Sequence, residues 1–283
     1  MQPIDLAYVV GLYREYADDL AAVGKQQREF AEALAGRMTP QLDDLEAEIT
    51  YLLLRAVRPA VVVELGTFHG WSTSWILSAL RDNGTGRLHS FDIVDNVRRN
   101  VPAELGEGRW TFVQGDVRET VGRVPADAGY LFVDAAHTAR FARWYLAHLF
   151  PRVPAGIPVS VHDVYHFPVT LPFHEGRVVV RWLREHRTPF FTPARARVRA
   201  STTRSTRCGG SWAWRRCGGS GGQPDDLLQD AGGRLSCAGA AVLLGLGEEG
   251  AAVVVGDVGG GEELVQHAST IDFGALADIR AEH

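Results

Sequence analysis

Carboxylate and imidazole side chains follow two short apolar runs of the sequence. Asp134 and His137 come after the run YLFV, and His162, Asp163 and His166 come after PVSV. Two carboxylates with a nearby imidazole can bind a divalent metal ion, which lowers the pKa of a bound hydroxyl group. A neutral imidazole is also the usual proton acceptor near physiological pH. These residue types predict assisted removal of a proton, although any one histidine has the alternative role of ordering its loop.

A turn containing two glycines follows an earlier apolar run. In VVVELGTFHGWST, residues 61–73, Gly66 and Gly70 bracket a tight turn after Glu64. Glycine is needed where the backbone bends sharply or approaches a ligand closely. Phe68 occupies the second glycine position of the nicotinamide fingerprint G-x-G-x-x-G, and the sequence has no G-x-x-x-x-G-K-[ST] phosphate loop. The turn therefore disfavours a nicotinamide cofactor and suits a ligand without a pyrophosphate, such as S-adenosylmethionine.

Two further carboxylates end the next two apolar runs. Asp92 closes LHSFD, close to the offset of about twenty residues at which a carboxylate meets ribose hydroxyl groups. Asp116 follows WTFVQG, where a polar turn can hydrogen-bond an adenine edge. Asp116 is equally suited to be the N-cap of the following segment, VRETVGRV, and the two roles are compatible.

The elements that must position these residues alternate between strand and helix patterns. Short runs rich in valine and aromatic residues are typical of strands buried on both faces. The amphipathic segments between them indicate crossover helices, so the strands should be parallel. Five such units are followed by a sixth helix, VVVRWLREH, and a sixth strand, PFFTP. The pattern predicts an α/β protein with a doubly wound, mostly parallel sheet, whose strand ends form the ligand-binding crevice.

A helical extension precedes the first strand. Apolar residues at roughly helical spacing predict one helix over residues 4–38 and, after Pro40, a second helix with Leu42, Leu45, Ile49, Leu52 and Leu53 on one face. Both helices are expected to cover one side of the sheet. The first helix has the alternative role of a lid over the site.

Three parts of the chain are predicted: a helical extension or cap over residues 1–55, the core over 56–195, and an irregular Gly-, Arg- and Ser-rich segment over 196–283. With suitable synonymous codons, Thr202 to Cys217 read one nucleotide out of frame encode a well-patterned amphipathic helix. The last segment is therefore hypothesised to be a frameshift product. The alternative is an authentic flexible tail, with AGAAVLLGLG and AAVVVGDV as edge strands.

Composition restricts the partners. The 283 residues are 46% hydrophobic and 22% charged, as in soluble globular proteins, and a net charge of -5 argues against a nucleic-acid partner. No signal peptide and no apolar run of about twenty residues is evident, so no membrane anchor is expected. Cys208, Cys217 and Cys237 fit neither a zinc knuckle nor a disulfide framework, which favours a cytoplasmic location.

The ordered motifs resemble those of class I S-adenosylmethionine-dependent methyltransferases over about residues 45–165. The resemblance is carried by Glu64-Leu65-Gly66, Asp92, Gly115-Asp116, Phe132-Val133-Asp134-Ala135-Ala136-His137 and Val161-His162-Asp163. The sequence is most similar to the methyltransferase-24-like group, which has a strand-four D-x-x-H and a strand-five H-D and is related to catechol-type and antibiotic-tailoring O-methyltransferases. This resemblance implies a Rossmann-like fold and S-adenosylmethionine as cofactor.

The resemblance also implies roles for individual residues. The expected cofactor-binding residues are Glu64, Gly66, Thr67, Gly70, Ser72, Asp92, Asp116 and Asp134. The expected catalytic residues are His137, His162 and Asp163, with His137 the preferred base. A divalent ion, Mg2+ or another, would be bound by Asp134, Asp163 and His166, with water as the alternative to His166, since Val164 occupies the position of a third oxygen ligand in metal-dependent relatives. A site without metal is the alternative.

The expected function is methyl transfer to a small-molecule acceptor, with a hydroxyl group favoured and a homodimer as the candidate assembly. The acceptor itself follows from no spacing rule in the sequence. The alternative function is a non-catalytic methyltransferase-like protein, in which the altered C-terminal segment prevents completion of the sheet. A nicotinamide-dependent oxidoreductase is disfavoured by Phe68.

Overall fold

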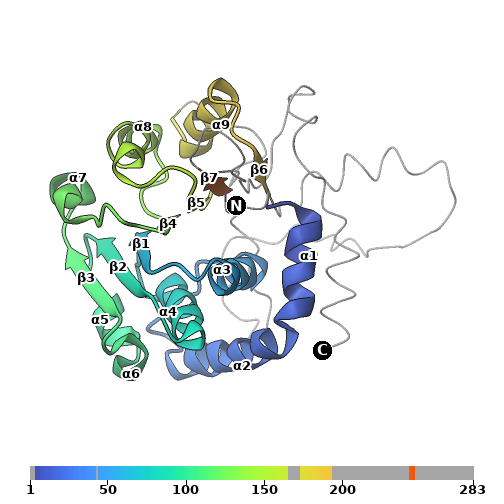
Figure 1. The fold of residues 1–283 in the computed structure, drawn as a ribbon. Coiled ribbons are helices and arrows are strands. Elements are labelled where there is room, and N and C mark those ends of the chain that lie inside the picture. Colours follow the sequence, from blue (N-terminus) through green and yellow to red (C-terminus); the bar gives the residue numbers. More distant parts are fainter. Residues whose placement is uncertain (1–3, 43, 165–172, 193–241, 246–283) are drawn as a thin grey trace, which may run out of the picture.

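A seven-stranded sheet organises the part of the chain that the structure, a computed structural model, describes: residues 4–42, 44–164, 173–192 and 242–245 (Figure 1). The strands lie in the order β3-β2-β1-β4-β5-β7-β6. Their bounds are β1 Val61–Leu65, β2 Arg87–Asp92, β3 Trp110–Gln114, β4 Tyr130–Val133, β5 Pro158–Val161, β6 Phe190–Phe191 and β7 Val242–Gly245. Strands β1 to β5 are mutually parallel, so the predicted doubly wound, mostly parallel α/β fold is confirmed.

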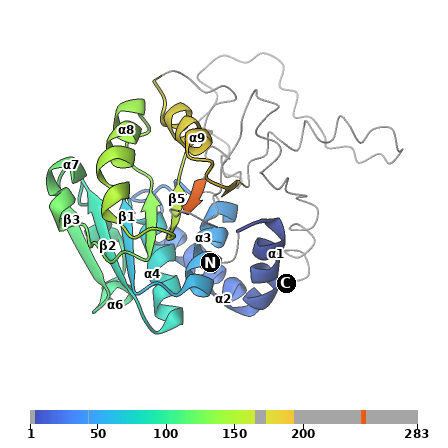
Figure 2. The ribbon, with the colours of Figure 1, turned by 45° about the horizontal axis from the view of Figure 1, so that its top comes forward.

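Helices cover both faces of this sheet. The α-helices are α1 Leu6–Glu15, α2 Ala17–Ala33, α3 Asp44–Val57, α4 Trp71–Asn83, α5 Val97–Asn100, α6 Ala103–Gly106, α7 Val117–Thr120, α8 Ala139–His148 and α9 Glu175–Glu185, and the 3-10 turns are η1 Val121–Arg123 and η2 Phe150–Arg152. Two apolar clusters result. In the first cluster, helices α1, α2, α3 and α4 pack against strand residues such as Val62 and Phe132. In the second, helices α8 and α9 pack against strand residues such as Val63 and Val133 (Figures 1 and 2). Neighbouring strand residues alternate between the clusters, as the period of a strand requires.

Backbone hydrogen bonds continue beyond the carboxyl ends of the central strands. Gly66 N donates to Phe91 O, Asp134 N to Leu65 O and His162 N to Val133 O, each at 2.8 Å. The residues that follow β1, β4 and β5 are therefore held in register with one another. This continuation fixes the edge of the sheet at which the predicted site residues lie.

The N-terminal extension differs from its prediction in one respect. The expected single helix over residues 4–38 is two helices, because Tyr16 leaves the helical conformation at φ -109° and ψ 25°. Helix α1 packs mainly on α3, whereas α2 also reaches α4, so the chain must change direction between them. Asp18 and Asp19 then begin α2, where acidic side chains suit the helix dipole.

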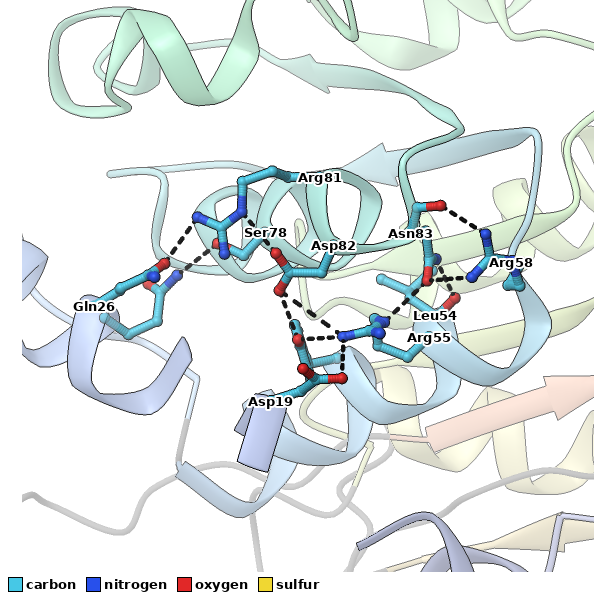
Figure 3. Close-up of polar contacts among 11 residues, drawn as sticks. Asp19, Gln26, Leu54, Arg55, Arg58, Ser78, Arg81, Asp82 and Asn83 are labelled. Carbon is cyan, nitrogen blue, oxygen red and sulfur yellow. Dashed lines mark hydrogen bonds and ion pairs between the residues drawn. The ribbon is translucent and has the colours of Figure 1, made fainter. Parts of the chain in front are cut away.

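A partly buried polar network joins the extension to α4 (Figure 3). Arg55 on α3 donates from Nε to Asn83 Oδ1 at 3.0 Å, and its Nη1 lies 2.8 Å from Asp19 Oδ2 on α2. The hydroxyl of Tyr51 accepts from Arg55 Nη1 at 2.8 Å and donates to Asp82 Oδ2 at 2.6 Å. Helices α2, α3 and α4 are thus held together by polar contacts as well as by apolar packing.

The segment after residue 195 is described only at Val242–Gly245. This strand pairs antiparallel with both β5 and β6, so it lies inside the sheet, and the expected edge-strand position for the run AGAAVLLGLG is wrong. The run AAVVVGDV and the proposed frameshift region lie outside the described residues. The division of the chain near residues 55 and 195 stays a prediction. None of the helices in the described ranges is long and apolar enough to span a membrane.

Candidate functional site

The turn after β1 adopts the conformation that its two glycines permit. Gly66 has φ +84° and Gly70 has φ +94°, a left-handed region that L side chains rarely occupy. A Cβ atom on Gly66 would lie 1.7 Å from the carbonyl oxygen of Asp134, so the turn crosses directly over the end of β4. Phe68 between the glycines also has a positive φ, of 42°. This close approach brings the glycine turn beside the residues that follow β4.

Asp92, at the end of β2, holds the glycine turn in place. Its Oδ2 accepts hydrogen bonds from Thr67 N at 2.6 Å, from Thr67 Oγ1 at 3.0 Å and from Phe68 N at 2.7 Å. Its Oδ1 accepts from Val94 N at 3.0 Å. The carboxylate predicted to meet a ribose therefore also shapes the loop that would bind the rest of the cofactor.

Glu64 lies beneath the turn and is fully buried. Its carboxyl group accepts hydrogen bonds from Ser72 Oγ at 2.8 Å, from Thr73 Oγ1 at 2.9 Å and from Ser90 Oγ at 2.6 Å. Ser72, predicted to bind cofactor, is thus engaged with Glu64 in this structure. Burial raises the pKa of Glu64 to about 7, despite the three hydroxyl donors, and the charge of Asp134 adds to the rise.

The raised pKa of Glu64 predicts a pH-dependent stability difference between wild type and Glu64→Gln. Because the folded protein binds the Glu64 proton more tightly than the unfolded chain, wild type should lose stability relative to the variant as the pH rises from 4.5 to about 7. The relative loss in the free energy of unfolding should be about 3 kcal/mol, and should not grow further above that range. Urea unfolding of both proteins across this pH range measures it. A pH-independent difference would contradict the prediction.

Asp116 and His69 have local structural roles. Asp116 is the N-cap of α7, and its Oδ1 accepts from Arg118 N at 2.9 Å, while the Arg118 guanidinium pairs with the same carboxylate. The predicted N-cap role is confirmed, and the predicted adenine contact stays a prediction. His69 Nδ1 accepts from Thr39 N at 3.1 Å, so His69 links the glycine turn to the N-terminal extension.

Two aspartates and two histidines meet where β4 and β5 end. His162 Nδ1 lies 3.1 Å from Asp134 Oδ1 and 3.5 Å from Asp163 Oδ1. His137 Nε2 lies 3.6 Å from Asp134 Oδ1 and 3.4 Å from Asp163 Oδ2. In the described ranges, Asp134, His137 and His162 form a group whose ligand atoms all lie within 4.8 Å of one another, a spacing that suits a metal ion. His166 lies outside the described residues.

The outer nitrogen of each histidine faces a buried carboxylate. His162 Nε2 lies 3.0 Å from Glu46 Oε2 on α3, and His137 Nδ1 lies 3.1 Å from Glu175 Oε2 at the start of α9. Tyr145 Oη donates to the other oxygen of Glu175 at 2.8 Å. Neither glutamate was predicted as a site residue from the sequence. A charged residue among the apolar positions of α3 was the available signal for Glu46.

Charge within this cluster shifts the pKa values of its members. Burial lowers the pKa of His162, but the facing Asp134 and Glu46 outweigh it and raise that pKa well above its usual value. Burial raises the pKa of Asp134, but His162 and His137 outweigh it and lower that pKa. The contact between His162 and Asp134 therefore requires a positive charge.

Three large apolar side chains are exposed among the described residues. Two of them follow strand ends, and the third belongs to a residue that is hydrogen-bonded to the segment after β4. Phe68 is in the glycine turn, Ile93 follows Asp92, and Phe173 is 70% exposed. Phe173 O accepts from Ala139 N, which places the segment before α9 against the loop that follows β4. His174 is the N-cap of α9 and accepts from Gly176 N. Exposed apolar groups beside a polar cluster are typical of a ligand-binding region.

Comparisons with known proteins agree on one class of domain. Residues 63–164 match a family model described as a methyltransferase domain. A curated protein of Mycolicibacterium smegmatis (strain ATCC 700084 / mc(2)155), whose name is that of an O-methyltransferase, is 31% identical over 134 residues, which are 45% of this chain and 54% of the relative. The chain thus spans about half the length of the curated relative that it matches.

Solved structures also resemble this chain. An O-methyltransferase from Bacillus cereus in complex with SAH has a TM-score of 0.47 at 16% identity, covering 56% of this chain and 77% of that one. The O-methyltransferase TomG from Streptomyces achromogenes, in complex with SAM, has a TM-score of 0.44 at 21% identity, covering 56% and 76%.

Proposed function

From the premise that residues 63–164 form a methyltransferase domain, we propose that this chain transfers the methyl group of S-adenosylmethionine to a hydroxyl group of a small molecule. In this reaction the acceptor oxygen loses its proton and forms a bond to the methyl carbon as the sulfur–carbon bond breaks. S-adenosylhomocysteine is the leaving group. Because the cofactor supplies an activated carbon, the protein must position the acceptor and receive its proton.

The observation that carries this proposal is the placement of a glycine turn, a strand-end carboxylate and an Asp–His cluster at one edge of the sheet. The Asp–His cluster consists of Asp134, His137, His162 and Asp163. Gly66 lies against Asp134, and Asp92 binds the turn at Thr67 and Phe68. Ligands of parallel α/β sheets bind outside the carboxyl ends of the strands. We assign the turn and Asp92 to the cofactor, and the cluster beyond Asp134 to the acceptor.

Proton removal is assigned to His137. Its side chain is 33% exposed, whereas that of His162 is 3% exposed, so His137 is the more accessible of the two to an acceptor. Glu175 lies 3.1 Å from Nδ1, which leaves Nε2 directed toward the two aspartates. In this proposal Glu175 orients the imidazole and stabilises the cation that forms when it takes a proton. The exposed Phe173 supports an acceptor with apolar or aromatic character.

Calorimetric titration with S-adenosylmethionine tests the proposal. Wild type should bind the cofactor with micromolar affinity and should not bind NAD. Asp92→Ala should weaken binding by about 10- to 100-fold, since hydrogen bonds to a charged group are worth about 1.5–3 kcal/mol. Asp95→Ala is the matched control, because Asp95 is an exposed carboxylate three positions further along the chain.

The outcomes separate the candidate functions. Binding that Asp92→Ala weakens and Asp95→Ala preserves would support the cofactor assignment and justify a screen of hydroxylated acceptors. A folded protein that does not bind S-adenosylmethionine would contradict an active methyltransferase and favour the non-catalytic alternative. The cytoplasmic location and the homodimer stay predictions from the sequence and the resemblance.

A further inference from the structure

The Asp–His cluster contains a polar contact that no proton donor of the described protein satisfies with good geometry. His162 is 3% exposed, and its Nδ1 has no hydrogen-bond partner among the described residues, although Asp134 Oδ1 lies 3.1 Å away. With a hydrogen on Nε2 facing Glu46, Nδ1 carries a lone pair. In the neutral ring this lone pair and the carboxylate oxygen repel each other at this distance, so either a second ring proton or a metal ion must lie between them.

His137 presents a second nitrogen to the same oxygen. Glu175 faces Nδ1, so the lone pair of the neutral ring lies on Nε2, 3.6 Å from Asp134 Oδ1. Metal-binding histidines usually donate their other ring hydrogen to a carboxylate, which fixes the tautomer and the ring orientation. Here two histidines share this arrangement, and their outer carboxylates are almost completely buried.

The spacing of the inner atoms suits coordination. Metal–ligand distances of about 2.1 Å place neighbouring ligand atoms roughly 3.0–3.4 Å apart. The distances from the inner nitrogens to the carboxylates of Asp134 and Asp163 are 3.1, 3.4, 3.5 and 3.6 Å. Asp163 adopts φ +59°, a conformation that aspartate tolerates better than most residues. Its carboxylate borders the group formed by Asp134, His137 and His162.

We propose that Asp134, His137 and His162, bordered by Asp163, form a site selective for first-row transition-metal ions such as Co2+ or Zn2+ over Mg2+. Mg2+ prefers an octahedral shell of oxygen ligands, whereas imidazole nitrogens favour zinc, iron, cobalt and nickel. Two histidines with one carboxylate form a ligand set known to bind a transition metal and leave positions open. The donor set therefore disagrees with a magnesium site. This inference does not depend on methyl transfer, and a metal ion on His137 Nε2 would occupy the lone pair of that nitrogen and so exclude it as the proton acceptor.

The test is metal titration of the full chain, purified without a polyhistidine tag, stripped with a chelator and kept free of S-adenosylmethionine. Calorimetry with Co2+, Zn2+ and Mg2+ gives affinities, and the visible absorption of Co2+ reports nitrogen ligation. Co2+ should bind at least 100-fold more tightly than Mg2+, following the preference of imidazole for transition metals. Binding should change the Co2+ spectrum from that of the aqueous ion.

Variants distinguish this site from other histidines and cysteines of the chain. His137→Ala should weaken Co2+ binding at least 10-fold and alter the spectrum. Glu175→Gln should weaken it about 10- to 100-fold, the usual effect of losing a carboxylate that supports a histidine ligand. His148→Ala, which replaces an exposed histidine at the end of α8, should change neither. Circular dichroism confirms that each variant is folded.

Three results would overturn the proposal. Equal affinities for Mg2+ and Co2+ would show that the site does not select by nitrogen ligation. A Co2+ spectrum that His137→Ala leaves unchanged would place the bound ion elsewhere. Failure of wild type to bind any of the three ions would mean that a proton on His162 satisfies the contact with Asp134.

Discussion

Gly66→Ala should lower the free energy of unfolding by more than about 4 kcal/mol, a loss at the upper end for single substitutions. The added Cβ would lie 1.7 Å from the carbonyl oxygen of Asp134 and 2.6 Å from its carbonyl carbon. Both atoms are backbone, so no side-chain rotation relieves the contact. Either the glycine turn or the end of β4 must move, and both belong to the candidate site.

Gly36→Ala separates this steric effect from the effect of the backbone conformation. Gly36 has φ +80°, close to the +84° of Gly66, but nothing lies within 4 Å of an added Cβ. Its substitution should cost only about 1–2 kcal/mol, the penalty for a left-handed L residue. Urea unfolding followed by circular dichroism measures both variants. Equal losses at the two positions would show that the contact with Asp134 has no energetic importance.

His137→Gln should reduce the rate constant for methyl transfer at least 100-fold, measured with an acceptor found in the screen. General-base catalysis contributes about 10²- to 10⁴-fold, and glutamine cannot accept the proton. If His137 binds a metal ion instead of accepting the proton, the same substitution weakens that site, so the loss is expected under either role. The affinity for S-adenosylmethionine should stay within about threefold of wild type, because we assign the cofactor to the glycine turn and Asp92.

His148→Gln is the control for this activity measurement. His148 is exposed at the end of α8, the helix that begins just after His137, so it shares the element but not the cluster. Its variant should retain wild-type turnover. A loss of less than 10-fold in His137→Gln, with the fold intact, would remove His137 from the reaction and leave it the role of ordering the loop after β4.

The placement of the site could be predicted from the sequence because strand ends are local features. Asp92 ends an apolar run, and Asp134 and Asp163 follow one within two residues. The parallel order of the strands brings such residues to one edge of the sheet. The glycine turn was equally visible, since the left-handed conformations of Gly66 and Gly70 are those that require glycine.

The supporting residues could not be predicted in the same way. Glu46 contacts His162 across 116 positions of the chain, and this contact depends on which face of α3 packs against the sheet. Glu175 reaches His137 because the segment before α9 pairs with the loop after β4, through the bridge between Thr138 and His174. Periodicity identifies a buried face but not the opposite partner, so a buried carboxylate shows its role only when the fold is known.

The position of β7 has a consequence for the order in which the protein forms during synthesis. Strand β6 joins the sheet only through Val242–Gly245, which leaves the ribosome well after Phe190–Phe191. Until then the nascent chain carries β1 to β5 with the outer backbone groups of β5 unpaired. An unpaired strand edge invites association with other chains. Stop codons placed between residues 192 and 242 should therefore yield products that depend more on chaperones than the full chain does.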